Sequence, residues 1–468
     1  MSGMGHRLQR VVFWGLSVVL CLAPLPFGSN RAWGWGTMAL MVALLLLLWS
    51  LAAFAPDRPR PFPLRRLAIV AVPFAVVVLW SLAQSMPFVP AAWSNPFWAI
   101  TADALHVKLA GTISLEPEAS RVALLRLLTY GGVFWLAVQI GQDAERGNAL
   151  LRLLVIAGGC YAAYGLVNHI LTGSRSTLWY TRPSEHLEPV FHLSSTFIYY
   201  NNYATYAGIG LLAALLLVFQ RVHERARHTG GVKAAAREFI LGLFDGGAWL
   251  LVCIVLMATA LFLTTSRAGT VAFVLGFAVL MIALRASGMI GTRGAILAAG
   301  LAAVPLVALL LLSGGQLLDR MAMIASSFDE RERLLRNVIS AFVDQPRRGW
   351  GHGTYSSVYF LYRDMRPGDY FDKAHNTYVE NLADFGLIAG MALNLVFVAI
   401  FAVAMMGVLR RKRHRHFACL TLAALALLAW HSAVDFPLQI PALAITFAAV
   451  AGIGFAQSWS SRGGGEQA

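Results

Sequence analysis

Residues 381–406 read NLADFGLIAGMALNLVFVAIFAVAMM, a run that is long and apolar enough to cross a lipid bilayer as a helix. The eight residues before it, KAHNTYVE (373–380), are mostly polar. Polar side chains at the mouth of a membrane helix are inexpensive when they face water and costly when they face lipid. What this mouth can do therefore depends on the side of the membrane on which it opens.

The composition extends this interpretation to the whole chain. Of its 468 residues, 58% are hydrophobic, and the mean hydropathy is +0.64, whereas soluble domains are about 45–50% apolar. We therefore expect an all-α integral membrane protein. Basic cytoplasmic loops explain the net charge of +14 better than a nucleic-acid partner does, so no nucleic acid is expected. The four cysteines lie inside apolar runs, which favours packing over disulfides or a zinc site.

Twelve segments have the length and composition of membrane spans. They cover approximately residues 9–27, 33–55, 67–86, 121–141, 149–172, 196–220, 248–265, 269–285, 294–313, 379–408, 417–435 and 440–458. The expected organisation is nine spans in 1–313, a loop or cap in 314–378, three spans in 379–458 and a cytoplasmic tail in 459–468. The first run could pass for a signal peptide, but a second span follows so soon that an uncleaved span is expected.

The charge distribution predicts the orientation. With the N-terminus inside, the cytoplasmic segments carry 21 of the 37 Lys and Arg residues, among them the run RRKRHRH (410–416). Nine of the others lie in 314–378, and long loops cross a membrane regardless of charge. We therefore expect both termini to be cytoplasmic and the long segments 87–120, 173–195 and 314–378 to lie outside.

The longest outer segment, 314–378, has a pattern of its own. Apolar residues recur at helical spacing in DERERLLRNVISAF (329–342), which predicts a helix. The glycines and proline of QPRRGWGHGTY (345–355) then predict a loop. The segment is expected to form a helical cap, and the polar mouth at His375 is expected to open outward, where no ATP pool exists.

Two arginines are candidates for binding an anion. Arg267 lies in the short turn TTSRAGT (264–270), so its guanidinium sits near the outer surface and needs an anionic partner or a route to water. It either snorkels to lipid headgroups or points toward the bundle centre. Arg331, in DERERLLR, either lies on a solvated helix face or takes part in the chemistry.

The polar mouth itself supplies candidates for acid–base chemistry. His375, Asn376 and Glu380 fall on one wide arc of a helix, so the imidazole and the amide can face one cavity. Histidine is the usual general base near neutral pH, although a capping or interfacial role is the alternative for this residue. Asp435, in HSAVDFPLQIPA (431–442), needs a cationic partner and is either a structural lock or a carboxylate of the site.

A third kind of candidate is a surface for sugars. Tyr199, Asn201 and Asn202, in STFIYYNNYATYAG (195–208), combine aromatic faces with amides, although an interfacial aromatic belt would also explain the tyrosines. No Walker loop, HExxH, CxxC or DxD motif occurs in the sequence. We therefore expect no metal, no cofactor and no nucleotide-sugar donor.

Taken together, these motifs resemble the O-antigen ligase and O-antigen polymerase superfamily. The resemblance extends from ISLEPEASRVALLRLLTYGGVFWLA (113–137) to HSAVDFPLQIPA. Its most specific part is an Arg, a helix, a Pro, a Gly-x-Gly-x-Gly loop and a His-Asn pair, matched by Arg331, Pro346, Gly349, Gly351, Gly353, His375 and Asn376. Arg267 matches the Ser-Arg turn of the family and Asp435 its Val-Asp-Phe hairpin, whereas Leu335 replaces a Trp that many relatives carry.

The resemblance implies a GT-C-like, metal-independent glycosyltransferase of the bacterial inner membrane with a periplasmic active site. Its donor would be a glycan on undecaprenyl diphosphate, and its acceptor a hydroxyl of lipid A-core. The alternative is an O-antigen or exopolysaccharide polymerase, whose acceptor is another lipid-linked glycan. A transporter or flippase is less favoured, because the two halves do not visibly repeat and the polar residues gather at the outer surface.

The roles follow from that resemblance and the chemistry of each side chain. Arg267 and Arg331 would hold the diphosphate, His375 would be the base for the acceptor hydroxyl, and Asn376 and Asp435 would orient it. The expected substrate-binding residues are Arg336, Asn201, Asn202, Tyr199 and Glu380.

Overall fold

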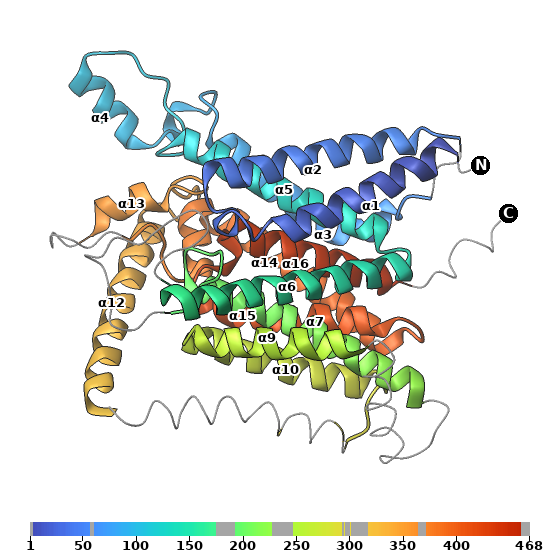
Figure 1. Cartoon of the computed structure of the whole chain (residues 1–468). Coiled ribbons are helices and arrows are strands. Elements are labelled where there is room, and N and C mark those ends of the chain that lie inside the picture. The colour runs from blue at the N-terminus through green and yellow to red at the C-terminus, as the bar shows by residue number, and fades with distance from the viewer. Residues whose placement is uncertain are drawn as a thin grey trace.

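A computed structural model describes residues 3–56, 60–174, 192–226, 247–292, 294, 300, 317–363 and 371–459. These residues are helical apart from turns and loops, and no strand occurs among them (Figure 1). The helices are α1 (Met4–Leu22), α2 (Ala32–Ala53), α3 (Leu64–Gln84), α4 (Pro96–Leu105), α5 (Pro117–Ile140), α6 (Ala144–Thr172), α7 (Tyr200–Ala226), α9 (Ala248–Leu263), α10 (Arg267–Ala286), α12 (Leu317–Asp344), α13 (Tyr355–Tyr362), α14 (Thr377–Arg410), α15 (Arg415–Val434) and α16 (Pro441–Gln457), with three 3₁₀ turns η1 (Phe27–Ser29), η2 (Ala91–Trp93) and η6 (Pro437–Gln439).

The described residues confirm the expected all-α class and the presence of several helices of membrane-spanning length. Among the described residues, eight helices are long and apolar enough to cross a membrane, namely α2, α3, α5, α6, α7, α10, α14 and α15. The apolar helices α9 and α16 are shorter. Eleven of the twelve predicted spans overlap a described helix, and most of the twelfth, 294–313, lies outside the described residues. Because α1, α9 and α16 are not among the eight helices named above, the number of twelve spans stays a prediction.

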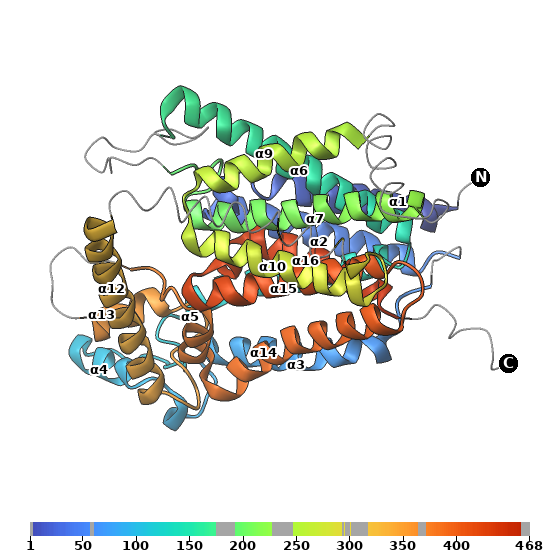
Figure 2. The same ribbon diagram turned by 90° about the horizontal axis from the view of Figure 1, so that it is seen from below.

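The long helices form one bundle, in which α16 is buried along its whole length. Helix α16 packs against α5, α10 packs against α15, and α14 packs against α3. Figure 2 shows α3 and α14 side by side along one flank of the bundle. Apolar residues on the outer faces of α2, α3 and α14 remain exposed, which is expected where a helix meets lipid.

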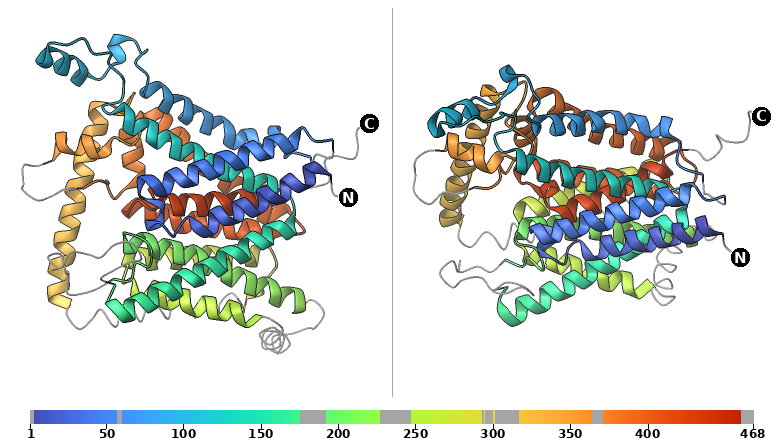
Figure 3. Two further views of the ribbon diagram at one scale, coloured as in Figure 1. Left: turned by 45° about the horizontal axis from the view of Figure 1, so that its top comes forward. Right: turned by 90° about the horizontal axis from the view of Figure 1, so that it is seen from above.

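Helices α12 and α13 lie at one end of the bundle, and α12 runs across the ends of the other helices (Figures 1 and 3). Helix α12 contains the predicted helical stretch 329–342 and packs against α14. At the opposite end, α1 begins and α16 ends. The start of the chain and the end of α16 therefore share one end of the bundle, and α12 occupies the other.

The predicted span 379–408 is interrupted. Gly386 in α14 has a φ of +75° and a ψ of 176°, so the helix breaks after its first two to three turns. A side chain is excluded there, because a Cβ on Gly386 would lie 2.6 Å from the carbonyl oxygen of Arg347. Only glycine combines this backbone conformation with so close an approach. The first segment of α14 is thus separate from the longer segment that continues through the bundle.

Candidate functional site

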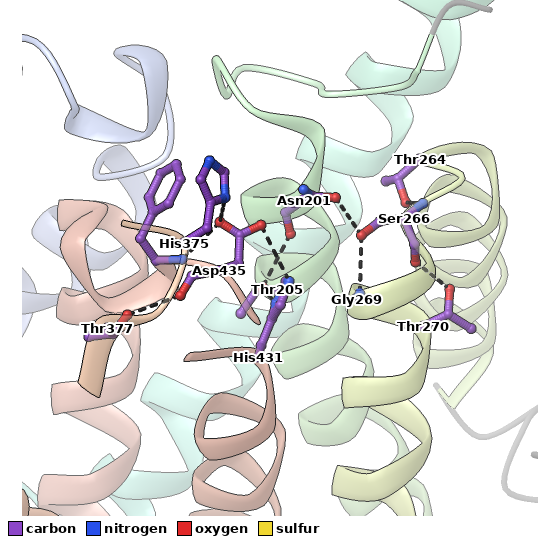
Figure 4. A network of polar contacts seen from close by, with 11 residues as sticks. Asn201, Thr205, Thr264, Ser266, Gly269, Thr270, His375, Thr377, His431 and Asp435 are labelled. Atoms are coloured by element: carbon purple, nitrogen blue, oxygen red, sulfur yellow. Dashed lines mark hydrogen bonds and ion pairs between the residues drawn. The ribbon is translucent and has the colours of Figure 1, made fainter. Parts of the chain in front are cut away.

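The predicted site residues gather at the end of the bundle that α12 crosses. Four chain segments meet there: the start of α7, the turn between α9 and α10, the start of α14 and the turn between α15 and α16. Figure 4 shows the polar contacts that join them. Segments far apart in sequence thus contribute to one local network.

The central contact joins His375 to Asp435. The Nδ1 atom of His375 lies 3.5 Å from Oδ1 of Asp435, whose side chain is only 2% exposed. His375 has a φ of +51°, a left-handed conformation that costs a non-glycine residue roughly 1–3 kcal/mol. Two bonds hold this backbone: the Ala374 N–H donates to Oε2 of Glu380 at 2.9 Å, and the Thr377 hydroxyl donates to the Asp435 carbonyl at 3.1 Å. The imidazole is thereby fixed beside the carboxylate.

A second histidine lies on the other side of Asp435. The Nε2 atom of His431, a fully buried residue, is 3.8 Å from Oδ2, and the backbone N–H of Phe436 donates to Oδ1 at 2.8 Å. Burial acts to raise the pKa of Asp435, but the proximity of His375, the charges of both histidines and the hydrogen bond from the Phe436 N–H outweigh it. They hold that pKa below the ordinary carboxyl value. The carboxylate is therefore ionised at neutral pH.

The network continues from His431 toward the first turn of α10. The Thr205 hydroxyl is hydrogen-bonded to Nδ1 of His431 and lies 3.2 Å from the carbonyl of Asn201. The Ser266 hydroxyl donates to Oδ1 of Asn201 at 2.7 Å and accepts the N–H of Gly269, which caps α10. The next residue after this cap is Arg267, which is exposed. Arg267 and His375 accordingly lie at the same end of the bundle.

The two arginines predicted on α12 have different surroundings. Arg331 is exposed and lies near enough to His431 for its charge to act on that imidazole. Arg336 is also exposed, but it pairs with Glu332 one turn away at 3.1 Å. Such surface pairs contribute little to stability. Arg331 is thus the α12 arginine associated with the histidine–aspartate cluster.

Asn376 and Glu380 have structural contacts that the sequence reasoning did not assign to them. Asn376 is the N-cap of α14, and its Oδ1 accepts the backbone N–H of Val379 at 3.2 Å. Glu380 is 3% exposed and folds back onto the Ala374 N–H. Both side chains therefore shape the turn that carries His375. Their roles in catalysis and substrate binding stay predictions.

The predicted sugar surface divides into two parts. The ring of Tyr199 stands perpendicular to that of Phe436, with centroids 5.3 Å apart, and Phe436 lies 5.0 Å from the ring of His375. Asn201 faces Ser266 in the network already described. Asn202, in contrast, is 1% exposed, and its amide has no hydrogen-bond partner among the described residues. Tyr199 and Asn201 adjoin the cluster, whereas Asn202 is buried in the bundle.

The Gly-x-Gly-x-Gly loop supplies hydrogen-bond partners to groups at the break in α14. The N–H groups of Trp350 and Gly351 donate to the Ala383 and Asp384 carbonyls at 2.9 and 3.0 Å. The carboxylate of Asp384 accepts the N–H of Gly353 at 2.7 Å. Because a helix break frees backbone groups that must find partners when buried, the loop supplies what the helix loses. The loop thus fixes the short helical segment that begins just after His375.

Helix α3 contributes a buried side chain to the same joint. The amide of Gln84, fully buried, donates to the carbonyls of Arg348 and Asp384 at 2.8 Å each and accepts the N–H of His352 at 3.2 Å. The ring of His352 is bonded to the hydroxyl of Ser81 at 2.9 Å. One glutamine therefore connects α3, the glycine loop and the broken helix.

Sequence reasoning missed His431, Gln84 and Asp384. The spacing of His431 and Asp435 was a usable signal, because residues four apart lie on one helix face. No comparable signal identified Gln84 or Asp384, since a polar residue inside an apolar run has no unique partner. Chemically, an ionised carboxylate beside a half-buried imidazole can orient a base, and exposed guanidiniums nearby can bind an anion.

Residues 252–394 match the family model described as O-antigen ligase. The matched segment contains Arg267, Arg331, the glycine loop 349–353 and His375, whereas Asp435 lies outside it. A search of curated proteins found no match.

Proposed function

We propose that this chain, whose residues 252–394 match the family model described as O-antigen ligase, transfers a glycan from undecaprenyl diphosphate to a hydroxyl of lipid A-core. The family match and the eight long apolar helices support a multi-pass membrane protein of the glycosyltransferase type whose partners are lipid-linked glycans and the bilayer.

The observation that carries the proposal is the His375–Asp435 pair at the α12 end of the bundle. A carboxylate that holds the Nδ1 proton of an imidazole leaves Nε2 with its lone pair free, which is the state that a general base requires. The ring of His375 is 26% exposed on its side chain, so a substrate hydroxyl can reach it. His375 would therefore take the proton of the acceptor hydroxyl.

The arginines supply the second half of the chemistry. When the acceptor oxygen bonds to the anomeric carbon, the bond from that carbon to the diphosphate oxygen breaks, and the lipid diphosphate leaves with the electron pair. Fixed guanidiniums stabilise that growing negative charge and stay protonated at every relevant pH. Arg267 and Arg331, both exposed at this end, are the residues we assign to the diphosphate. The acceptor proton passes from His375 to water. Cleavage of the sugar–diphosphate bond supplies the energy, so no external energy source is required.

The same proposal fixes the orientation. The end of the bundle that carries the site would face the periplasm, with both termini in the cytoplasm and α12 and α13 forming the helical cap. The arrangement in which α1 begins and α16 ends opposite to α12 supports this orientation. Donor energy then resides in the sugar–diphosphate bond rather than in ATP.

The test is the product formed by purified protein in liposomes with a lipid-diphosphate glycan donor and lipid A-core. Glycan joined to lipid A-core supports the ligase, and longer chains that remain on the lipid diphosphate would instead make the protein a polymerase. Arg267→Gln should abolish most of the transfer, whereas Arg121→Gln, an exposed arginine paired with Glu118, should not. Passage of the glycan-lipid across the membrane without any new glycosidic bond would overturn the proposal.

A further inference from the structure

His431 is a buried histidine that the mechanism above does not use. Its side chain is fully buried on α15, one turn before Asp435, and it lies against the carboxylate oxygen that His375 does not approach (Figure 4). The carboxylate is thus placed between two imidazoles, one half-buried and one wholly buried. A buried charge placed in this way requires a hydrogen-bond partner on each oxygen.

The hydrogen count at Thr205 limits the protonation of His431. Thr205 has one hydroxyl proton and two neighbours that can accept it, the Asn201 carbonyl and Nδ1 of His431. If the proton goes to Nδ1, a neutral His431 carries its own proton on Nε2. If it goes to the carbonyl, Nδ1 must donate to the hydroxyl, and Nε2 of a neutral ring would present a lone pair to the carboxylate.

Only protonation of Nε2 in His431 is compatible with the buried carboxylate oxygen that faces it. Nε2 of His431 and Oδ2 of Asp435 are both buried, lie 3.8 Å apart and have no hydrogen-bond partner among the described residues. Two acceptors facing each other in a buried site would be unfavourable, so Nε2 carries a proton, in a neutral or in a doubly protonated ring. His431 therefore directs an N–H toward Oδ2 in either case, across the 3.8 Å that separates the two atoms.

We propose that His431 is a positioning residue for His375. With its Nε2 proton directed at Oδ2, it keeps the Asp435 carboxylate ionised and in place. That carboxylate in turn keeps the proton of His375 on Nδ1 and the lone pair on Nε2. The inference rests on the proposed function only in the last step, where Nε2 receives the proton of the acceptor hydroxyl.

Other charged side chains also lie at this end of the bundle. The charge of Arg331 on α12 acts on His431, Arg267 begins α10, and Lys373 and Glu380 flank His375 on its own segment. None of these side chains forms a salt bridge with Asp435 among the described residues. The two histidines are therefore the charge partners of Asp435. Removing either histidine changes the proton affinity of the Asp435 carboxylate that the other one faces.

The experiment compares His431→Leu and His431→Gln with wild type by two measurements on purified full-length protein. The first is ¹⁵N NMR of histidine rings, with the His375 signals identified by their loss in His375→Gln. Wild type should show His375 protonated on Nδ1. His431→Leu should shift this ring toward a mixture of tautomers, and His431→Gln, which retains a donor, should largely restore it. An unchanged His375 spectrum in His431→Leu overturns the inference, whether or not the protein transfers glycan.

The second measurement is the dependence of kcat on pH. His431→Leu should lower kcat about tenfold to a hundredfold and move the acidic limb of the profile to lower pH, because a carboxylate that is no longer held in place stabilises the doubly protonated His375 ring less. His416→Leu is the matched control, since His416 is a buried histidine at the other end of α15, bonded to Asn148. A fall in kcat with an unmoved limb in His431→Leu would mark a purely structural residue and contradict the inference. Absence of transfer by wild type would overturn the proposed function alone, since the NMR result decides the positioning role independently.

Discussion

The carboxylate of Asp384 accepts the backbone N–H of Gly353 at 2.7 Å and so joins a broken membrane helix to the loop that packs on its break. The short segment of α14 before Gly386 begins at Thr377, immediately after His375 and Asn376. The position of the candidate base is therefore coupled to this joint.

Gly386→Ala should destabilise the protein. The new Cβ would lie 2.6 Å from the Arg347 carbonyl oxygen, and the backbone conformation is strained for any residue with a side chain. We expect a loss of roughly 2–4 kcal/mol and a lower midpoint of thermal unfolding. Gly288→Ala is the control, because Gly288 has nearly the same φ and nothing within 4 Å. Equal effects of the two substitutions would show that the close contact at Gly386 is unimportant.

Gln84→Leu tests whether the contacts between α3, the glycine loop and the broken helix α14 affect activity separately from overall stability. It removes two hydrogen bonds to carbonyls and one from a backbone N–H, at a cost of about 2–4 kcal/mol. Gln457→Leu removes comparable bonds to the Gly141 and Gln142 carbonyls at the opposite end of the bundle. Both variants should unfold at lower temperature. Only Gln84→Leu should also reduce transfer per folded molecule, and equal activity in the two would refute the coupling.

Acid should destabilise the protein through His352. Burial, assisted by the charges of Arg126 and Lys373, lowers the pKa of His352 to about 3. Between pH 6.5 and 3, His352 is therefore neutral in the folded protein and protonated in the unfolded chain. This contribution is fully present above pH 6.5, the ordinary histidine pKa, and is lost as the pH falls from about 6.5 toward 3, at up to about 1.4 kcal/mol per pH unit. Thermal unfolding of wild type and His352→Gln, followed from pH 7 to 5, should show a smaller decline in the variant. Parallel declines would contradict the assignment.

Arg331 and Arg336 should differ, although they lie on the same helix and are both exposed. Arg331→Gln should reduce kcat/KM for the donor about tenfold to a thousandfold, because we assign its guanidinium to the negative charge that develops on the diphosphate. Arg336→Gln only breaks a surface pair with Glu332 and should change kcat/KM by less than about threefold. Steady-state kinetics on the two purified variants decide the matter, and a larger effect at Arg336 would reverse our assignment of the diphosphate.

Much of this architecture could be predicted because bilayer thickness fixes the length of an apolar span, and runs such as 417–435 satisfy it without ambiguity. The break at Gly386 could not, since glycines are common in membrane helices and φ depends on tertiary contacts. His375 and Asp435 were predicted singly from residue type, but their pairing required the fold. Asn376 was predicted as catalytic, and the structure adds a helix cap that any Asn before a helix could form.

The central claim is that His375 removes the acceptor proton while other residues hold the donor. The most direct measurement is kcat for glycan transfer by His375→Gln, made beside the donor dissociation constant on the same folded preparation. We predict that kcat falls at least a hundredfold while the dissociation constant changes less than about threefold. Turnover near the wild-type value with normal folding would contradict the account.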